Sequence, residues 1–239
     1  MKTIFFLICA LTIRSMSANE GFVPLFNGRD LSGWKIPEGD KGHWRVVDGA
    51  IDYDARSEAP ASKDLWTERS FRDFTLRLEW RIKQTTGLFP MPVVLPDGTE
   101  KLGADGKPIV QLRENADSGI YLRGFHKTQV NIWCWPIGSG EVYGVRTDES
   151  LPRATRAAVT PKERADRPVG EWNQFEITLR GDRLTVVLNG RTVIENAQLP
   201  GIPEEGPLGL QHHGGYENGK YLPASSVVQF RKIAIQELR

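Results

Sequence analysis

The fold class is decided by one stretch of the chain, Phe74-Thr-Leu-Arg-Leu-Glu-Trp-Arg-Ile82, in which apolar and polar residues alternate without a break. Successive side chains of a strand point to opposite faces, so this pattern predicts a half-buried β-strand with a charged outer face. An Asp-Gly dipeptide between two alternating runs predicts a hairpin over 44–53. Similar patterns predict further strands at 118–123, 129–135, 172–179, 183–188, 192–195, 208–213 and 227–238. Many short strands without a sustained 3.6-residue period predict an all-β, two-sheet antiparallel sandwich.

The length and composition set bounds on domain organisation and partners. A chain of 239 residues with 39% hydrophobic and 26% charged residues can bury one sizeable core. We expect a single domain over residues 19–239, with a long Pro- and Gly-rich insertion at about 83–117 and one helical turn near 161–165. The formal charge of +1 makes nucleic acid an unexpected partner. The sequence does not indicate an oligomeric state.

The first 18 residues have the pattern of a secretory signal peptide. Lys2 precedes an apolar run over 4–13, and small residues at 15–18 suit a cleavage site. The run is too short for a transmembrane helix, so we expect export to the periplasm or beyond. Cys9 lies inside this run, which leaves a lipid anchor as a weaker alternative. Cleavage would remove two of the 31 basic residues and none of the 30 acidic ones, giving a nearly neutral chain.

Cysteine usage argues against a disulfide and against thiol chemistry. The chain has two cysteines, and cleavage of the signal would leave only Cys134. An intrachain disulfide is then excluded even in an oxidising compartment. Cys134 falls on the apolar face of the strand predicted at 129–135, where a small buried hydrophobic residue is chemically inert.

The same strand, with the turn that follows it, contains the first candidate binding residues. Gln129, Asn131, Trp133 and Trp135 share one face of the predicted strand. Amides hydrogen-bond to sugar hydroxyls and indoles stack on sugar C–H faces, so this combination predicts a carbohydrate-binding surface. A Gly- and Ser-rich turn then brings in Glu141, which is either a groove residue or an ordinary loop carboxylate. The two Trp could also serve simply to cover a neighbouring loop.

Other strands would add to this surface if they were its neighbours. The strands predicted at 74–82, 118–123 and 208–213 would add their outward-facing side chains, which are Arg77, Glu79, Arg81, Tyr121, Arg123, Gln211 and His213. His213 is the natural general base of the set, because its imidazole titrates near neutral pH. A lone His is often structural, and Glu79 between two Arg could be part of a solvated charge stripe. His212 and His213 are adjacent and point to opposite faces, which argues against a metal site made from this pair.

Several catalytic signatures are absent from the sequence. There is no Gly-x-Gly-x-x-Gly fingerprint, Walker motif, His-Glu-x-x-His helix or Gly-x-Ser-x-Gly elbow. Dinucleotide-binding, nucleotide-binding, zincin and α/β-hydrolase interpretations are therefore disfavoured.

The chain resembles the 3-keto-disaccharide hydrolase domain, formerly a domain of unknown function, over nearly its whole mature length. The resemblance is carried by segments in a characteristic order: 25–34, 44–49, Phe74–Arg81, Asp117–Arg123, 170–173, 188–190, Gly206–Gly214 and 228–233. Where many members have a Tyr-Glu-Val-Gln-Ile-like strand, this chain has Lys127-Thr-Gln-Val-Asn-Ile132, which keeps the Gln and replaces the Glu by Thr128. The resemblance implies a concanavalin A-like jelly-roll fold of the lectin and glucanase type.

The resemblance also implies an activity, cleavage of glycosides whose C3 hydroxyl has been oxidised to a ketone. The C3 carbonyl acidifies the C2 proton, so a base can remove it and the C1 substituent leaves by β-elimination, after which water can add. On this basis the candidate base is His213 or Glu79, and Arg123 would stabilise the enolate. A divalent cation could assist or replace Arg123, although no compact ligand motif is present. The candidate sugar contacts are Gln129, Asn131, Trp133, Trp135, Gln211, Glu141, Tyr121 and Arg81.

Two alternatives remain open from the sequence. The same face would serve a carbohydrate-binding module without catalysis, because fold alone does not decide function. A jelly-roll glycosidase with two carboxylates is less favoured, since no strand carries a Glu-x-Asp-x-x-Glu arrangement.

Overall fold

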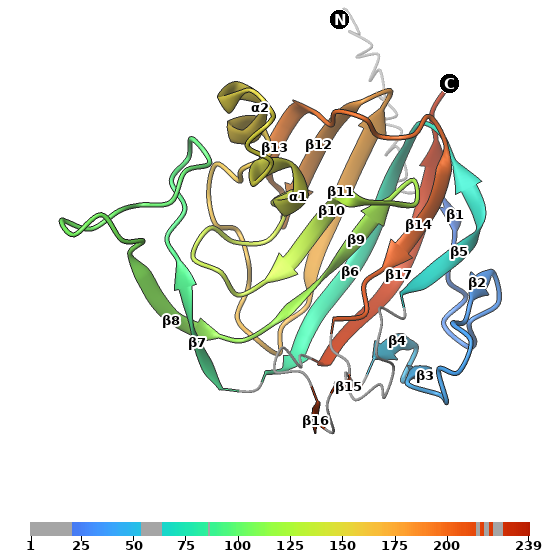
Figure 1. The fold of residues 1–239 in the computed structure, drawn as a ribbon. Helices are drawn as coiled ribbons and strands as arrows, with labels where there is room; N and C mark the ends of the chain where they lie inside the picture. The colour runs from blue at the N-terminus through green and yellow to red at the C-terminus, as the bar shows by residue number, and fades with distance from the viewer. Residues whose placement is uncertain (1–20, 54–63, 86, 214–215, 218–219, 222–226) are drawn as a thin grey trace, which may run out of the picture.

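Two antiparallel sheets packed face to face form the body of the protein (Figure 1). The computed structural model describes residues 21–239 except 54–63, 86, 214–215, 218–219 and 222–226. The all-β, two-sheet antiparallel sandwich predicted from the alternating pattern is therefore confirmed. The segment predicted to be a signal peptide lies outside the described residues.

The larger sheet has eight strands within the described part of the chain. Its order is β13 (Arg191–Gln198), β12 (Arg183–Leu188), β11 (Asn173–Arg180), β6 (Phe74–Gln84), β17 (Val227–Glu237), β4 (Ala50–Tyr53) and β3 (Trp44–Val47), with β1 (Val23–Pro24) paired to β17. The strand that decided the fold class, β6, lies near the middle of this sheet. Its burial alternates from Phe74 to Ile82, as predicted.

The smaller sheet has five strands among the described residues. Its order is β10 (Phe125–Trp133), β9 (Asp117–Leu122), β14 (Gly206–Leu210), β5 (Leu65–Phe71) and β2 (Trp34–Lys35). Neighbours such as β9 and β14 are far apart in sequence, and such long connections between antiparallel strands are typical of a jelly roll. The strand β5 was not predicted from the sequence, because its residues do not alternate regularly.

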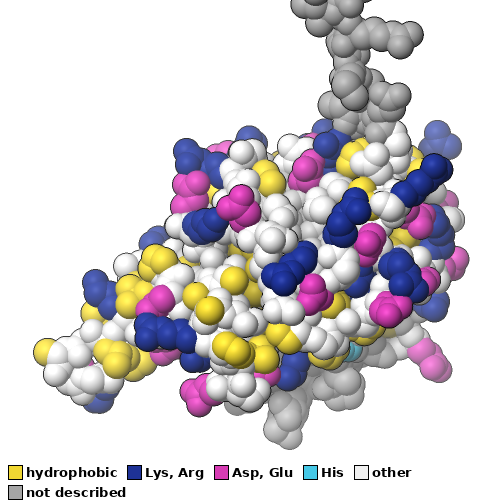
Figure 2. Space-filling view, turned by 90° about the horizontal axis from the view of Figure 1, so that it is seen from above, with side chains coloured by type: hydrophobic (Ala, Val, Ile, Leu, Met, Phe, Trp, Pro, Cys, Tyr) yellow, Lys and Arg dark blue, Asp and Glu magenta, His cyan; other side chains and the backbone are white. Residues whose placement is uncertain are grey.

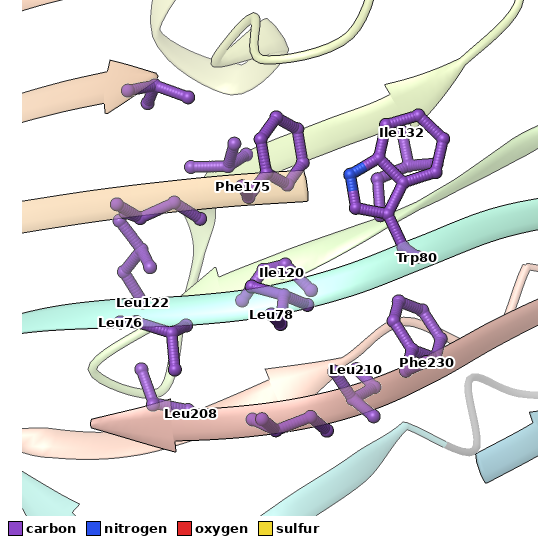
Figure 3. Close-up of a cluster of buried hydrophobic side chains, with 14 of the residues drawn as sticks. Leu76, Leu78, Trp80, Ile120, Leu122, Ile132, Phe175, Leu208, Leu210 and Phe230 are labelled. Atoms are coloured by element: carbon purple, nitrogen blue, oxygen red, sulfur yellow. The ribbon is translucent and has the colours of Figure 1, made fainter. Parts of the chain in front are cut away.

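The core lies between the two sheets (Figure 3). Leu76, Leu78 and Trp80 of β6 face residues from the smaller sheet. The labelled partners in the close-up are Ile120, Leu122, Ile132, Leu208 and Leu210. Each large apolar side chain buried in this way contributes about 1.5–3 kcal/mol. Since these residues point inward, the residues that alternate with them on the smaller sheet point outward.

An arm projects from the body between β6 and β9. It contains the hairpin of β7 (Leu88–Pro92) and β8 (Val110–Glu114), followed by a narrower extension with bridges at Val94–Glu100 and Leu102–Pro108. The extension touches the body again at Asp97, which forms an ion pair with Arg153. Figure 1 shows the arm extending to one side of the smaller sheet.

Two short helices and a second hairpin complete the described structure. The helices are α1 (Tyr143–Arg146) and α2 (Arg153–Ala158), and the hairpin joins β15 (Tyr216–Glu217) to β16 (Lys220–Tyr221). The helical turn predicted near 161–165 is wrong, because the helix lies several residues earlier. Neither described helix is long or apolar enough to span a bilayer. On the face seen in Figure 2, basic and acidic side chains are interspersed, in keeping with the small net charge.

Candidate functional site

The outward face of the smaller sheet presents its side chains in rows set by the strand register. In the first row, Trp66, Gly209, Tyr121 and Gln129 lie opposite one another across β5, β14, β9 and β10. In the next row Gly119 pairs with Asn131, and in the third Asp117 pairs with Trp133. Gln211 belongs to the second row, since its backbone N–H donates to the Gly119 carbonyl. The register therefore brings together residues from four strands that are remote in sequence.

Two glycines make the floor of this face flat. A Cβ atom at Gly209 would lie 2.7 Å from the Trp66 ring, and one at Gly119 would lie 2.4 Å from the Gln129 amide nitrogen. The absence of these side chains lets Trp66 and Gln129 lie across neighbouring strands. The Trp66 ring stacks on Tyr121 with a centroid distance of 5.4 Å and an interplanar angle of 17°. The result is an aromatic platform of the kind on which sugar C–H faces stack.

A chain of polar groups runs beside the platform. The Gln129 amide donates to the Gln211 side-chain oxygen, and the Tyr121 hydroxyl hydrogen-bonds to the Gln211 side chain. Burial raises the pKa of Tyr121, and the charges of Asp64 and Asp117 raise it further. The phenol therefore stays protonated at neutral pH and can donate a hydrogen bond to a ligand.

A carboxylate and an imidazole lie at one end of the polar chain. His213 Nδ1 is 3.6 Å from Asp117 Oδ2, and the two side chains are 34% and 27% exposed. Burial raises the pKa of Asp117 to about 6, although the charge of His213 opposes this shift. The pair combines a titratable base with a carboxylate that can orient it, an arrangement recurrent in general-base catalysis.

Four residues predicted for the site therefore share this face: His213, Tyr121, Gln129 and Gln211. Thr128, which replaces the Glu of the resembled family, points the other way. Its hydroxyl is buried and donates toward the carbonyl oxygens of Leu122 and Phe125 at 3.1 and 2.9 Å. The difference at position 128 consequently does not remove a carboxylate from the outward face.

Asn131 and Glu141 lie on the flank of the face and are buried. The backbone N–H of Asn131 donates to the Glu141 carbonyl, and Gly140 donates to the Asn131 carbonyl, which continues the sheet beyond β10. The Glu141 side chain is fully buried and forms an ion pair with Arg146, which is itself 4% exposed. Among the described residues, neither carboxylate oxygen of Glu141 has a hydrogen-bond partner. Glu141 is thus positioned on the flank of the outward face but closed off from solvent.

Trp133 and Trp135 stack on each other at 4.2 Å and pack against Tyr143. Trp133 is 3% exposed, and its indole N–H donates to the Gly138 carbonyl at 2.7 Å. It also packs against Val94 of the arm. The covering role considered from the sequence therefore applies to Trp133, whereas Trp135 is partly exposed.

Glu79 and Arg81 do not belong to this face. They lie on β6 in the larger sheet, so strand 74–82 is not a neighbour of the other three strands, and the placement of Glu79 and Arg81 at the site is wrong. Glu79 binds Arg231 and Lys232 at 2.6 and 2.7 Å. Burial raises the pKa of Glu79, but these hydrogen bonds and charges outweigh it and hold the pKa below its usual range. Arg81 donates to Gln229 on the same sheet.

The outward placement expected for Arg123 is also wrong. This residue begins the tight turn after β9 with a positive φ of 50°, and its side chain is 1% exposed. Its guanidinium donates to the carbonyl oxygens of Arg72, Gly181 and Pro203 and to the Asp73 carboxylate. With its donors directed to these groups, Arg123 joins loops together and is not available to an enolate.

Sequence reasoning did not single out four residues of the face: Asp64, Trp66, Asp117 and His126. His126 Nε2 lies 3.5 Å from Asp64 Oδ2, and the imidazole packs against Tyr121 and Trp66. Asp117 is the first residue of Asp117-Ser-Gly-Ile-Tyr, one of the segments that carry the family resemblance. That resemblance could have indicated Asp117 as a candidate site residue. Trp66 and Asp64 had no such signal because β5 lacks regular alternation.

Neither a reactive thiol nor a cluster of metal ligands is found among the described residues. The Cys134 side chain is buried in the core, as predicted, and burial raises the pKa of its thiol to about 12. Among the described residues there is no group of three or more His, Cys, Asp or Glu side chains placed to hold a metal ion.

The two-sheet jelly-roll architecture places the protein in the class of concanavalin A-like sandwich domains, here with an aromatic, amide-rich outward face on the smaller sheet. The model of the 3-keto-alpha-glucoside-1,2-lyase-like domain family matches residues 21–236, and the chain belongs to this family. No curated protein sequence matches the chain.

Solved structures of candidate glycosyl hydrolases from Parabacteroides distasonis share the fold. One is 20% identical with a TM-score of 0.57, covering 92% of this chain and 95% of that chain. A second is 22% identical with a TM-score of 0.57, covering 92% and 84%. A third is 18% identical with a TM-score of 0.53, covering 91% and 99%. At these identities the likeness establishes the fold alone.

Proposed function

We propose that the protein cleaves the glycosidic bond of 3-keto-glycosides by β-elimination, followed by addition of water. The base removes the C2 proton, and the C2–H electron pair forms a C1=C2 double bond conjugated with the C3 carbonyl. The C1–O bond breaks, and the leaving oxygen takes up a proton. Water adding across the double bond would complete a net hydrolysis. Membership of the 3-keto-alpha-glucoside-1,2-lyase-like family supports this reaction class.

The observation that carries the proposal is the Asp117–His213 pair at the end of the Gln129–Gln211–Tyr121 chain. His213 is the base, and Asp117 orients it and stabilises the imidazolium formed when it takes the C2 proton. Glu79 is not proposed for this role, because it lies on the other sheet in ion pairs with Arg231 and Lys232.

The developing enolate needs hydrogen-bond donors at the C3 oxygen. In place of Arg123, we assign this role to the Tyr121 hydroxyl and the side-chain amide of Gln211, which are hydrogen-bonded to each other within reach of the Asp117 charge. Both are neutral donors on a partly buried surface, where hydrogen bonds to developing charge are stronger than in water. A divalent cation as Lewis acid remains an alternative for the same position.

The test is to incubate the purified protein with a 3-keto-glycoside and with its unoxidised parent, with and without chelator, and to follow aglycone release. Release from the keto compound alone supports the proposal, and loss of release in chelator would assign the electrophilic role to a cation. His213→Ala should lower kcat/KM by about 10²–10⁴-fold, the range typical of a general base. The matched control is Glu79→Ala, which should retain activity. Equal activity in the two variants would remove His213 from the base role.

A second candidate function is carbohydrate binding without turnover. It is favoured by the Trp66–Tyr121 platform, which is built for stacking and requires no catalytic group. Binding of both the keto compound and its parent, lost in Trp66→Ala and unchanged in His213→Ala, with no aglycone release, would establish this alternative.

Export of the protein is part of the same proposal. We propose that residues 1–18 are cleaved as a signal peptide and that 19–239 acts as a single domain outside the cytoplasm. N-terminal sequencing of the protein recovered from cell fractions tests this, and a cytoplasmic product that begins at Met1 would refute it.

A further inference from the structure

A second carboxylate–imidazole pair lies on the same outward face as Asp117–His213. His126 Nε2 is 3.5 Å from Asp64 Oδ2. The Asp64 side chain is 2% exposed and accepts a hydrogen bond from the His212 backbone at 2.9 Å, so its position is fixed. The His126 side chain is 67% exposed, so the other ring nitrogen, Nδ1, can reach solvent or a ligand.

The imidazole of His126 is held over the platform. Its ring centroid lies 4.8 Å from that of Tyr121 and 5.6 Å from that of Trp66, in edge-on contacts with both. These contacts come from three segments, β5, β9 and the start of β10, and they restrict the orientation of an otherwise exposed side chain.

The two pairs approach the polar chain from different strands. Asp64 lies in the second row beside Gln211, because Leu65 pairs with Leu210, and His126 packs on Tyr121 in the first row. Asp117 lies in the third row on β9, two strands away from Asp64 on β5. Two strand spacings of about 4.8 Å and two residues of about 3.3 Å put about 12 Å between the two aspartate Cα atoms, which leaves room for one sugar ring between the pairs. The charges of Asp64 and Asp117 both act on the Tyr121 hydroxyl, which places that hydroxyl within reach of both pairs.

β-Elimination requires two proton transfers at different atoms. One group takes the proton from C2, and another supplies a proton to the oxygen that leaves C1. A single base at His213 accounts for the first transfer only. Without an acid, an alkoxide leaving group would depart unprotonated, which is slow for sugars and simple alcohols.

We infer that His126, oriented by Asp64, is the catalytic acid that protonates the leaving oxygen. This inference rests on the proposed function. In the elimination step, imidazolium His126 donates its Nδ1 proton to the glycosidic oxygen as the C1–O bond breaks and keeps its Nε2 proton toward Asp64. His213 takes the C2 proton in the same step. In the hydration step the roles reverse: His126 removes a proton from water as its oxygen bonds to C1, and His213 returns a proton to C2.

The test uses the dependence of the rate on the leaving group. Methyl 3-keto-α-glucoside has a poor leaving group that needs protonation, whereas 4-nitrophenyl 3-keto-α-glucoside releases a stable phenolate without it. His126→Ala should lower kcat/KM for the methyl compound by about 10²–10³-fold. The same variant should lower it by less than about threefold for the nitrophenyl compound, because that reaction bypasses the acid. Added imidazole should restore part of the lost activity.

The control variant is Lys127→Ala, an exposed neighbour that pairs with Asp148 away from the platform and should leave both rates unchanged. Equal losses on both compounds in His126→Ala would overturn the inference and assign the residue a structural or binding role. An unchanged rate on the methyl compound would overturn it as well. If the wild-type protein cleaves neither compound, the proposed function itself fails, which is a different result from either of these. Since His126 is exposed, its variant should fold, and an unchanged melting temperature verifies this.

Discussion

The substitution Gly209→Ala tests whether the Trp66 platform depends on a missing side chain. The new Cβ would lie 2.7 Å from two ring atoms of Trp66 and 3.0 Å from a third. Carbon atoms in contact prefer about 3.5–4.0 Å, so the ring must retreat by about 1 Å. Because Trp66 is partly exposed, it can move outward, and we expect a cost near the lower end of the usual 1–3 kcal/mol for overpacking.

The destabilisation caused by Gly209→Ala should disappear when the Trp66 ring is removed. Gly209 does not have a positive φ, so alanine is compatible with its backbone. In a Trp66→Ala background, Gly209→Ala should therefore stabilise the protein by about 0.4–1 kcal/mol, through the lower entropy of the unfolded chain. The two substitutions are thus expected to be coupled by about 1.4–2 kcal/mol, the sum of a cost of about 1 kcal/mol and a gain of about 0.4–1 kcal/mol.

The assay is urea unfolding of the wild type, both single variants and the double variant. A parallel titration with a 3-keto-glycoside should show about 2- to 13-fold weaker binding in Gly209→Ala, since aromatic stacking is worth about 0.5–1.5 kcal/mol. If the two substitutions are additive within about 0.5 kcal/mol, the ring does not lie over Gly209, and the description of the platform is refuted.

Three further outcomes are expected. Wild-type kcat/KM should fall below about pH 6, because protonation of Asp117, whose pKa is raised to about 6, removes the charge that supports His213. Asp117→Asn should lower kcat/KM also above pH 6, where the wild-type carboxylate is charged, and pH–rate profiles of the two proteins check this. Arg123→Ala should destabilise the fold by about 3–5 kcal/mol in urea unfolding, since it leaves three carbonyl groups without the guanidinium donor and Asp73 without its paired charge, while any folded fraction keeps a normal KM. Glu141→Gln should destabilise by a similar amount in urea unfolding, because it removes the buried carboxylate charge paired with Arg146; a change below about 1 kcal/mol would contradict the burial of this pair.

The sequence alone was sufficient for the architecture and for part of the site. The alternation from Phe74 to Ile82 predicts a strand whose inward face is apolar, and the structure buries those residues. The same period of two correctly assigned Gln129 and Tyr121 to an outward face and Cys134 to the core. Such local inferences hold because the direction of a side chain in a strand depends only on its position in the alternation.

Only the tertiary structure decided which outward faces belong together. Glu79 and Arg81 have the same local pattern as Gln129 and Tyr121, yet they lie on the other sheet because β6 pairs with β11 and β17. The pairing of strands depends on contacts between segments remote in sequence, which no local pattern contains. For the same reason the Asp64–His126 and Asp117–His213 pairs could not be predicted: each joins residues that the register of β5, β9, β10 and β14 brings together. Arg123 is buried because three loops present carbonyl groups to its turn, and that arrangement exists only once both sheets have formed.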